Sequence, residues 1–294
     1  MLELLVKLGL LVFRGLSQLP YPALRKLAST LSWVLYRLAA PRRKVTLTNL
    51  RLCFPEWDES RRVRLAKDHF RAFTQTFLDR FIFWFASEAR IRSLCSVEGL
   101  EHLQAALGKP LLIFSPHFVG MDAGGLRVQL ETQVFGMYAR QRSAALTQAM
   151  TEGRQRFNHT EMLLRTGGIR PALKRIKQNI PFYFCPDMDL GAKDAVFVDF
   201  FGVPAATVTT MHRLASMTGA QVLPCITTLT PTGYVMRFEP IWTDFPTTDE
   251  TADTRRMNAY IEQAVLRQPE QYLWSHRRFK TRPPGTPSVY ANKR

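Results

Sequence analysis

The chain has 294 residues, enough for one large α/β domain or two small ones. Apolar residues make up 46% of it, which excludes a chain that is disordered over most of its length. The formal net charge of +16 favours a polyanionic partner, whether nucleic acid, an anionic membrane surface or a phosphorylated substrate. The cysteines at 53, 95, 185 and 225 form no Cys-x-x-Cys pair, so we expect reduced core cysteines rather than disulfides or a zinc site.

The first twenty residues are apolar but are interrupted by Glu3, Lys7 and Arg14. In a helix these three positions share one narrow sector, because successive residues are about 100° apart. This pattern predicts a segment that lies in a bilayer interface, or one that inserts with its polar seam against protein; an ordinary buried helix is the alternative. The segment lacks the cleavage site of a signal peptide and is marginal for a spanning helix, which needs roughly 20 mostly uncharged residues.

A second apolar helix is predicted from Pro22 to Ala40, where Pro41 ends it. Trp33, Tyr36 and the basic cluster 42–44 are typical of an anchor in the headgroup region of a cytoplasmic leaflet, with a solvated helix end as the alternative. We therefore predict a membrane-associated helical segment over residues 1–44 and an α/β domain over residues 45–294.

A long helix is predicted from Glu59 to Ala86, capped by Asp58. Its last part, from Phe77 to Phe85, is apolar on nearly every face. This predicts core, with the lining of a groove for a hydrocarbon substrate as the alternative.

From Val97 onward, short apolar runs alternate with helical stretches. The predicted strands are Leu111–Phe114, Val134–Tyr138, Pro181–Cys185, Val196–Phe201, Gln221–Ile226 and Tyr234–Phe238. The predicted helices are Gly99–Leu107, Asp122–Leu130, Ser143–Phe157, Arg170–Gln178, Val208–Thr218 and Thr254–Arg267. This alternation predicts an α/β fold with a largely parallel sheet flanked by helices.

The most informative stretch is PLLIFSPHFVGMDAGG, residues 110–125. A buried strand ends before His117, so this side chain is expected at the carboxyl edge of the sheet, where open α/β folds bind ligands. His117 and Asp122 can meet only if His117 precedes the helix and folds back over its first turn. Asp122 would then fix one imidazole tautomer and leave the other nitrogen to take a proton from an alcohol. The alternative is a loop histidine near an unrelated aspartate.

Other stretches also carry chemistry. Arg154 and Arg156, downstream of Tyr138, suit phosphate recognition or oxyanion stabilisation, with an exposed basic helix as the alternative. Asp187 and Asp189 lie on a predicted turn after a strand, where they would bind a metal, position an arginine or form a polar loop; two carboxylates are a weak metal signal.

Two stretches lie further along the chain. Residues 197–207 are predicted as a strand, a turn and a helix start capped by Thr207. Residues 274–283 group Arg277, Arg278 and Lys280 with aromatic residues, as in a site for an anionic headgroup or in a basic tail that binds RNA.

Taken in this order, these segments resemble the lipid A biosynthesis late acyltransferases of Gram-negative bacteria, within the lysophospholipid acyltransferase superfamily. The resemblance runs from the first apolar helix nearly to the carboxyl terminus. The matching residues are HFVGMD (117–122), Tyr138 with Gly153 and Arg154, PDMDLG (186–191), FVDFFGVPAAT (197–207) and HRRFKTRPPG (276–285). The His-x4-acid motif is common to the superfamily, whereas the later blocks are more specific. Many relatives have Glu in place of Asp122, and a polar residue often replaces Met188.

The resemblance implies an enzyme on the cytoplasmic face of the inner membrane that needs no cofactor or metal. It would move a fatty acyl group from acyl carrier protein to a hydroxyacyl chain of a Kdo-bearing lipid A precursor. His117 would be the general base assisted by Asp122, and Arg154 the charge stabiliser with Arg156 in reserve. Asp187 would support the site by orienting Arg154. The implied substrate-binding residues are Tyr138, Arg156, Asp187, Asp189, Arg277, Arg278 and Lys280.

Three other hypotheses account for parts of the sequence. The nearest is an acyltransferase of the same superfamily that acts on a glycerophospholipid or aminolipid. A basic nucleic-acid-binding protein leaves the amino-terminal helices unexplained, so we expect no nucleic acid partner. A membrane scaffold without catalytic activity is the third.

Overall fold

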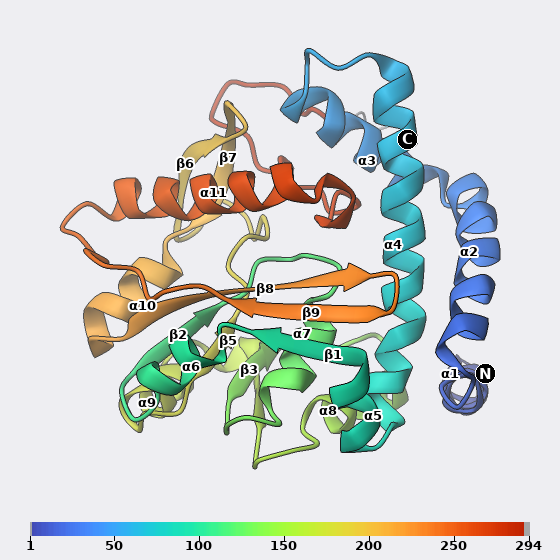
Figure 1. Ribbon diagram of the computed structural model, residues 1–294. Helices are drawn as coiled ribbons and strands as arrows, with labels where there is room; N and C mark the ends of the chain where they lie inside the picture. The colour runs from blue at the N-terminus through green and yellow to red at the C-terminus, as the bar shows by residue number, and fades with distance from the viewer. Residues whose placement is uncertain (1, 291–294) are drawn as a thin grey trace.

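The computed structural model describes residues 2–290 (Figure 1). The helices are α1 (Leu2–Leu16), α2 (Tyr21–Leu38), α3 (Ala40–Cys53), α4 (Glu59–Phe85), α5 (Glu88–Leu94), α6 (Leu100–Ala106), α7 (Met121–Val128), α8 (Ala144–Arg154), α9 (Arg170–Lys177), α10 (Thr210–Thr218) and α11 (Glu250–Arg267). The strands are β1 (Cys95–Glu98), β2 (Leu111–Phe114), β3 (Phe135–Tyr138), β4 (Glu161–Leu164), β5 (Phe182–Phe184), β6 (Ala195–Phe200), β7 (Val203–Val208), β8 (Gln221–Thr230) and β9 (Gly233–Phe238). Short 3-10 turns occur at Arg165–Gly167 and Pro269–Gln271.

The main sheet has the strand order β1-β9-β8-β2-β5-β3-β4. Its pairs are parallel except for the β8–β9 hairpin, so the predicted largely parallel α/β fold is confirmed. The central strand β2 is fully buried, and its side chains pack on both faces of the sheet. This is why all four of its residues are apolar. Leu112 and Phe114 belong to the core under α9, α10 and α11, whereas Leu111 and Ile113 belong to the core under α6 and α7.

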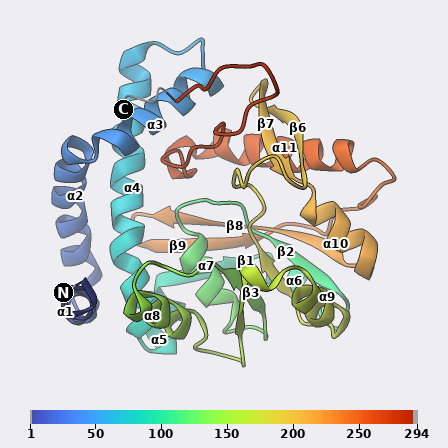
Figure 2. The ribbon, with the colours of Figure 1, turned by 180° about the vertical axis from the view of Figure 1, so that it is seen from behind.

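Helix α4 stands beside the carboxyl ends of the parallel strands, and α1 and α2 pack on its far side (Figures 1 and 2). Leu24 and Ala28 of α2 pack with Leu78 and Ile82 of α4 in a separate small core. The amino-terminal helices therefore cover an apolar face of α4 rather than standing apart from the sheet domain.

Helix α1 turns part of its polar seam toward the protein. The Glu3 carboxylate accepts hydrogen bonds from the backbone of Ala144 and Ala145, the first residues of α8, where the helix dipole favours an anion. The opposite side of α1 exposes apolar residues, namely Leu4, Leu5, Leu8, Leu11 and Val12. No helix within residues 2–290 has both the length and the apolar character needed to cross a bilayer.

The prediction that Thr207 caps a helix is wrong. Residues 203–208 form β7, which pairs antiparallel with β6, and α10 begins only at Thr210. The loop between the two strands is Phe201-Gly202, and both residues have positive φ (53° and 72°), as a tight two-residue hairpin with a right-handed twist requires. The resulting hairpin is a separate two-stranded sheet, so the predicted strand 196–201 lies outside the main one.

Pro41 starts a helix as well as ending one. Ala39 has a non-helical backbone conformation and separates α2 from α3. Pro41 lies in the first turn of α3, where the backbone N–H groups have no intrahelical partner, so the N–H that proline lacks is not needed. Arg42 and Arg43 consequently lie in that first turn and donate to the carbonyl groups of Ser275 and Tyr36. The predicted start of α4 is confirmed, because the helix begins at Glu59 and the Asp58 side chain caps it.

A buried carboxylate joins α2, α4 and the sheet. Asp79 is fully buried and accepts hydrogen bonds from Tyr21 (3.1 Å), Tyr234 (2.6 Å) and Gln75 (2.7 Å). Burial raises the pKa of Asp79 to about 6, because these uncharged donors only partly replace the lost hydration.

We expect Asp79 to make the protein less stable as pH rises. Its pKa is higher in the folded state than the ordinary value of 3.8, so its contribution to stability is fully present below pH 3.8 and is lost as pH rises through about 6. Relative to Asp79→Asn, the free energy of unfolding of the wild type should fall by about 2 kcal/mol between pH 4 and pH 8. Denaturant titrations at both pH values measure this difference, and a constant difference would contradict the assignment.

Candidate active site

His117 and Asp187 meet at the carboxyl edge of the sheet. His117 follows β2 and Asp187 follows the neighbouring parallel strand β5, so the two loops emerge side by side. The Nδ1 atom of His117 lies 2.6 Å from an Asp187 carboxylate oxygen, and the His117 backbone N–H also donates to this carboxylate at 3.0–3.1 Å. Asp187 is 1% exposed and the His117 side chain 17%. The ring is therefore held through Nδ1 by a buried carboxylate, and part of it remains accessible.

The pair fixes the state of the imidazole. Burial alone would raise the pKa of Asp187, but the charge and hydrogen bonds of His117 outweigh it and lower that pKa, which keeps Asp187 ionised. An ionised carboxylate can only accept a hydrogen bond, so in the neutral ring the proton is on Nδ1. The lone pair of the neutral ring is then on Nε2. No residue within 2–290 makes a hydrogen bond to this Nε2, so it is available as a base.

The predicted pairing of His117 with Asp122 is wrong. Asp122 lies in the first turn of α7, and its carboxylate is held by two arginines instead. The Nε and Nη2 atoms of Arg80 each lie 2.7 Å from one oxygen, and Nη2 of Arg154 lies 2.5 Å from the other. The suggestion that Asp187 orients Arg154 fails for the same reason, since Asp122 is the partner of Arg154.

Two guanidinium groups outweigh the cost of burying one carboxylate. Burial would raise the pKa of Asp122, but Arg154 and Arg80 lower it to about 2. The cluster of Arg80, Asp122 and Arg154 therefore carries one net positive charge beside the site. Sequence reasoning missed Arg80 because it lies within a stretch that was predicted to be core. The available signal was the pair of charged residues Asp79 and Arg80, in a helix segment that is otherwise apolar.

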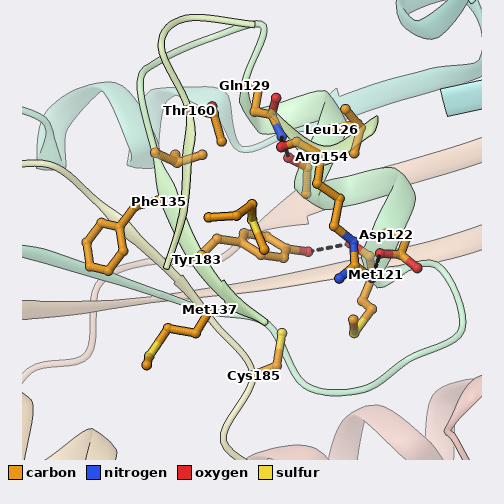
Figure 3. A pocket seen from close by; sticks show the side chains of 14 residues that line it. Met121, Asp122, Leu126, Gln129, Phe135, Met137, Arg154, Thr160, Tyr183 and Cys185 are labelled. Carbon is orange, nitrogen blue, oxygen red and sulfur yellow. Dashed lines mark hydrogen bonds and ion pairs between the residues drawn. The ribbon is translucent and has the colours of Figure 1, made fainter. Parts of the chain in front are cut away.

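An apolar pocket adjoins this cluster (Figure 3). Asp122 and Arg154 line one side, and Tyr183 donates a hydrogen bond to the Met121 carbonyl at the same side. The remaining lining is mainly apolar and comes from α7, β3 and their neighbours, including Leu126, Val134, Phe135, Met137 and Met162. Such a pocket with a few polar groups at one end suits a ligand with an apolar chain and a polar reacting end.

Two of the predicted arginines are structural in this fold. Arg156 donates to the carbonyl groups of Phe83 and Ala86 at 2.6 Å and so satisfies the carboxyl end of α4. Arg278 is 2% exposed and donates to Ala206 and Thr207 in the β6–β7 hairpin. Neither guanidinium group is open to a substrate, because carbonyl and hydroxyl oxygens of the fold already occupy it.

The remaining predicted residues are placed differently. Asp189 is buried and accepts from Thr281, which ties its loop to the carboxyl-terminal segment rather than to a ligand. Tyr138 is half-buried at the end of β3 and does not line the pocket of Figure 3. Arg277 and Lys280 are exposed and remain available to an anionic headgroup. All four cysteines are free, and Cys53, Cys95 and Cys225 are buried as expected.

A carboxylate-held histidine, an arginine cluster and an apolar pocket at the edge of a parallel sheet define an α/β protein with a site suited to acid–base group transfer. The family model for bacterial lipid A biosynthesis acyltransferases matches residues 2–281. The chain belongs to this family.

Individual relatives agree over nearly the whole chain. A lipid A biosynthesis acyltransferase of Haemophilus influenzae is 32% identical, covering 96% of this chain and 93% of its own. The lipid A biosynthesis lauroyltransferase of Escherichia coli is also 32% identical, over 96% and 94% of the two chains, and the palmitoleoyltransferase of the same organism is 31% identical. Among solved structures, a 1-acyl-sn-glycerophosphate acyltransferase from Thermotoga maritima matches with a TM-score of 0.41 and 15% identity, over 84% of this chain and 97% of its own.

Gly153 is needed for the position of Arg154. A Cβ atom at Gly153 would lie 2.4 Å from the indole of the buried Trp84, so Gly153→Ala must push α8 away from α4. We expect a loss of stability of about 1–3 kcal/mol. Gly15→Ala is the matched control, because it places the same methyl group on a helix where nothing lies within 4 Å. Equal melting temperatures for the two variants would contradict this role of Gly153.

Proposed function

We propose that the protein transfers a fatty acyl group from acyl carrier protein to a hydroxyl on an acyl chain of a Kdo-bearing lipid A precursor, at the cytoplasmic face of the inner membrane. The observation that carries this proposal is the His117–Asp187 pair, which holds Nδ1 and leaves Nε2 of His117 without a partner among residues 2–290. Family membership supports lipid A as the acceptor class.

His117 acts as the general base. Its Nε2 takes the proton of the acceptor hydroxyl while the hydroxyl oxygen attacks the thioester carbonyl carbon. The tetrahedral intermediate then expels the carrier thiolate, and the imidazolium returns the proton to it, which yields an ester and a free thiol. Asp187 stabilises the imidazolium and holds the ring in the productive tautomer, so it is a positioning residue.

The arginine cluster supplies the charge stabilisation. Arg154 uses one nitrogen on Asp122, and its other N–H groups have no partner within residues 2–290. They are available to the oxyanion or to a phosphate of the acceptor, since guanidinium groups bind both in a partly buried site. Arg80 and Asp122 hold this arginine in place. The apolar pocket beside it accommodates the acyl chain of the donor.

The charge of the chain suits these partners. A net charge of +16 attracts an acidic carrier protein, an anionic leaflet and lipid phosphates alike. The exposed apolar residues of α1 and α2, among them Leu8, Leu11 and Trp33, provide the surface that enters the bilayer.

Mass spectrometry of a Kdo-bearing lipid A precursor, incubated with a mixture of acyl-carrier-protein thioesters, tests the reaction. The wild type should add one acyl group, and His117→Ala should lower the rate by roughly 10²–10⁴-fold, because the general base is lost. Transfer to a lysophospholipid but not to the precursor would favour the rival glycerophospholipid or aminolipid acceptor. No transfer to either would favour a non-enzymatic scaffold.

Asp187→Asn tests whether the Asp187 carboxylate positions and stabilises His117. We expect kcat to fall by roughly 10²–10⁴-fold with little change in the KM of the acceptor, since Asn removes the charge that stabilises the imidazolium. Asp199→Asn, an exposed aspartate on β6, is the matched control. Full activity of Asp187→Asn would show that another group positions His117.

Membrane binding is tested by charging the α1 surface. The double variant Leu8→Glu, Leu11→Glu should reduce co-sedimentation with anionic vesicles by roughly tenfold or more. The reason is that the favourable free energy of transferring each leucine side chain from water to the bilayer is lost. Leu266→Glu, at a leucine of α11 that is 60% exposed, is the control. Equal binding by both variants would place the membrane surface elsewhere.

A further inference from the structure

A second hollow lies beside the Asp187 loop. It is a groove between α2, α4 and the segment 273–276, with a free volume of about 380 Å³ against about 70 Å³ for the pocket of Figure 3. Its walls include Leu35 of α2, Phe73 of α4 and Leu273. No residue is shared between the linings of the two hollows, so they are separate spaces.

The groove is joined to the active site through the backbone. The N–H of Leu273 donates to the carbonyl of His117 at 3.0 Å. Met188, the residue after Asp187, also lines the groove, as does His276, whose Nε2 accepts from the Asp189 N–H at 3.1 Å. A molecule in the groove therefore contacts Met188, next to Asp187, and Leu273, whose backbone is hydrogen-bonded to His117.

The walls of the groove continue into the exposed apolar surface. Phe73 and Phe77 are one turn apart on α4 and are each 36% exposed, and Phe77 packs edge-on against Phe13 of α1. On the α2 side, Leu35 lines the groove and Leu38 beside it is 75% exposed. Apolar side chains thus extend from the groove to the exposed apolar surface of α2 and α4.

One buried polar group lines the groove without a partner. His69 is fully buried, and its Nδ1 lies 3.1 Å from the Glu270 carbonyl oxygen, which can only accept. Nδ1 therefore carries the proton, and burial lowers the pKa of His69 to about 4, which keeps the ring neutral. The lone pair on Nε2 has no donor among residues 2–290. A buried acceptor of this kind needs an N–H or O–H donor.

We propose that this groove binds a hydroxyacyl chain of the lipid acceptor other than the one that is acylated, and that the hydroxyl of this chain donates a hydrogen bond to Nε2 of His69. Arg42, at the rim, donates to the Ser275 carbonyl at 3.2 Å and presents its remaining N–H groups to a phosphate of the same lipid. This inference rests on the proposed function. This acceptor chain and the donor chain then occupy separate spaces.

Photo-crosslinking tests the site without relying on turnover. The probe is a lipid A precursor whose hydroxyacyl chains end in diazirine groups, added to the full chain in detergent. We expect adducts on Leu35, Phe73 or Leu273, located by peptide mass spectrometry. Adducts confined to the pocket of Figure 3 or to the outer surface of α1 would overturn the proposal. Adducts in the groove of a wild type that transfers no acyl group would support the groove and refute the proposed function.

Kinetics of groove variants provide a second readout. Ala39→Phe fills the groove, so the KM for the lipid acceptor should rise roughly tenfold or more, whereas the KM for the acyl donor should change by less than about twofold. Ala105→Phe, at an exposed alanine of α6 that lines neither hollow, is the matched control and should behave as the wild type. An unchanged acceptor KM in Ala39→Phe would overturn the proposal.

His69→Asn isolates the hydroxyl contact. Asparagine keeps a donor for the Glu270 carbonyl but removes Nε2, so folding should be preserved while the acceptor KM rises roughly five- to tenfold. The variant should discriminate less between acceptors whose other chains carry or lack a hydroxyl. Wild-type discrimination in a folded His69→Asn variant would contradict the role of His69.

Discussion

The Asp122 carboxylate lies between two guanidinium groups, which outweigh the effect of burial and lower its pKa to about 2. Arg80 belongs to α4, Asp122 to α7 and Arg154 to α8, so a single ion-pair cluster ties the amino-terminal half of the molecule to the edge of the sheet. Helix α4 in turn carries α1 and α2 on its far side (Figure 2). The apolar outer surface, the pocket and the groove all depend on where this cluster holds α4.

The two aspartates of the site have different physical tasks. Asp187 accepts from the ring and backbone of His117, so it controls one proton position. Asp122 has no such proton to control, and it neutralises one of two arginines and orients both. Removal of either carboxylate would leave an unpaired buried group, but only Asp187 acts directly on the proposed base. This division explains why the site contains two carboxylates although only Asp187 contacts His117.

The two hollows give the proposed reaction a simple geometry. The pocket beside Arg154 and the groove beside Leu273 are separate spaces, so a donor chain and an acceptor chain can be bound at the same time. Direct attack of a hydroxyl on a thioester needs both substrates together and no enzyme nucleophile. Cys185 lines the pocket, but burial and nearby carboxylates raise the pKa of its thiol, which makes it a poor nucleophile.

The sequence alone determined the α/β alternation, the strand before His117 and the family resemblance, because buried strands, helix caps and motif spacing are local signals. It also identified His117, Asp122, Arg154 and Asp187 as site residues, but it paired them wrongly. Only the tertiary structure decided the partners, since β2 and β5 are neighbours in the sheet although their loops are 70 residues apart. The same holds for Arg80 and the groove: a contact between α4 and distant loops depends on packing, which no local pattern encodes.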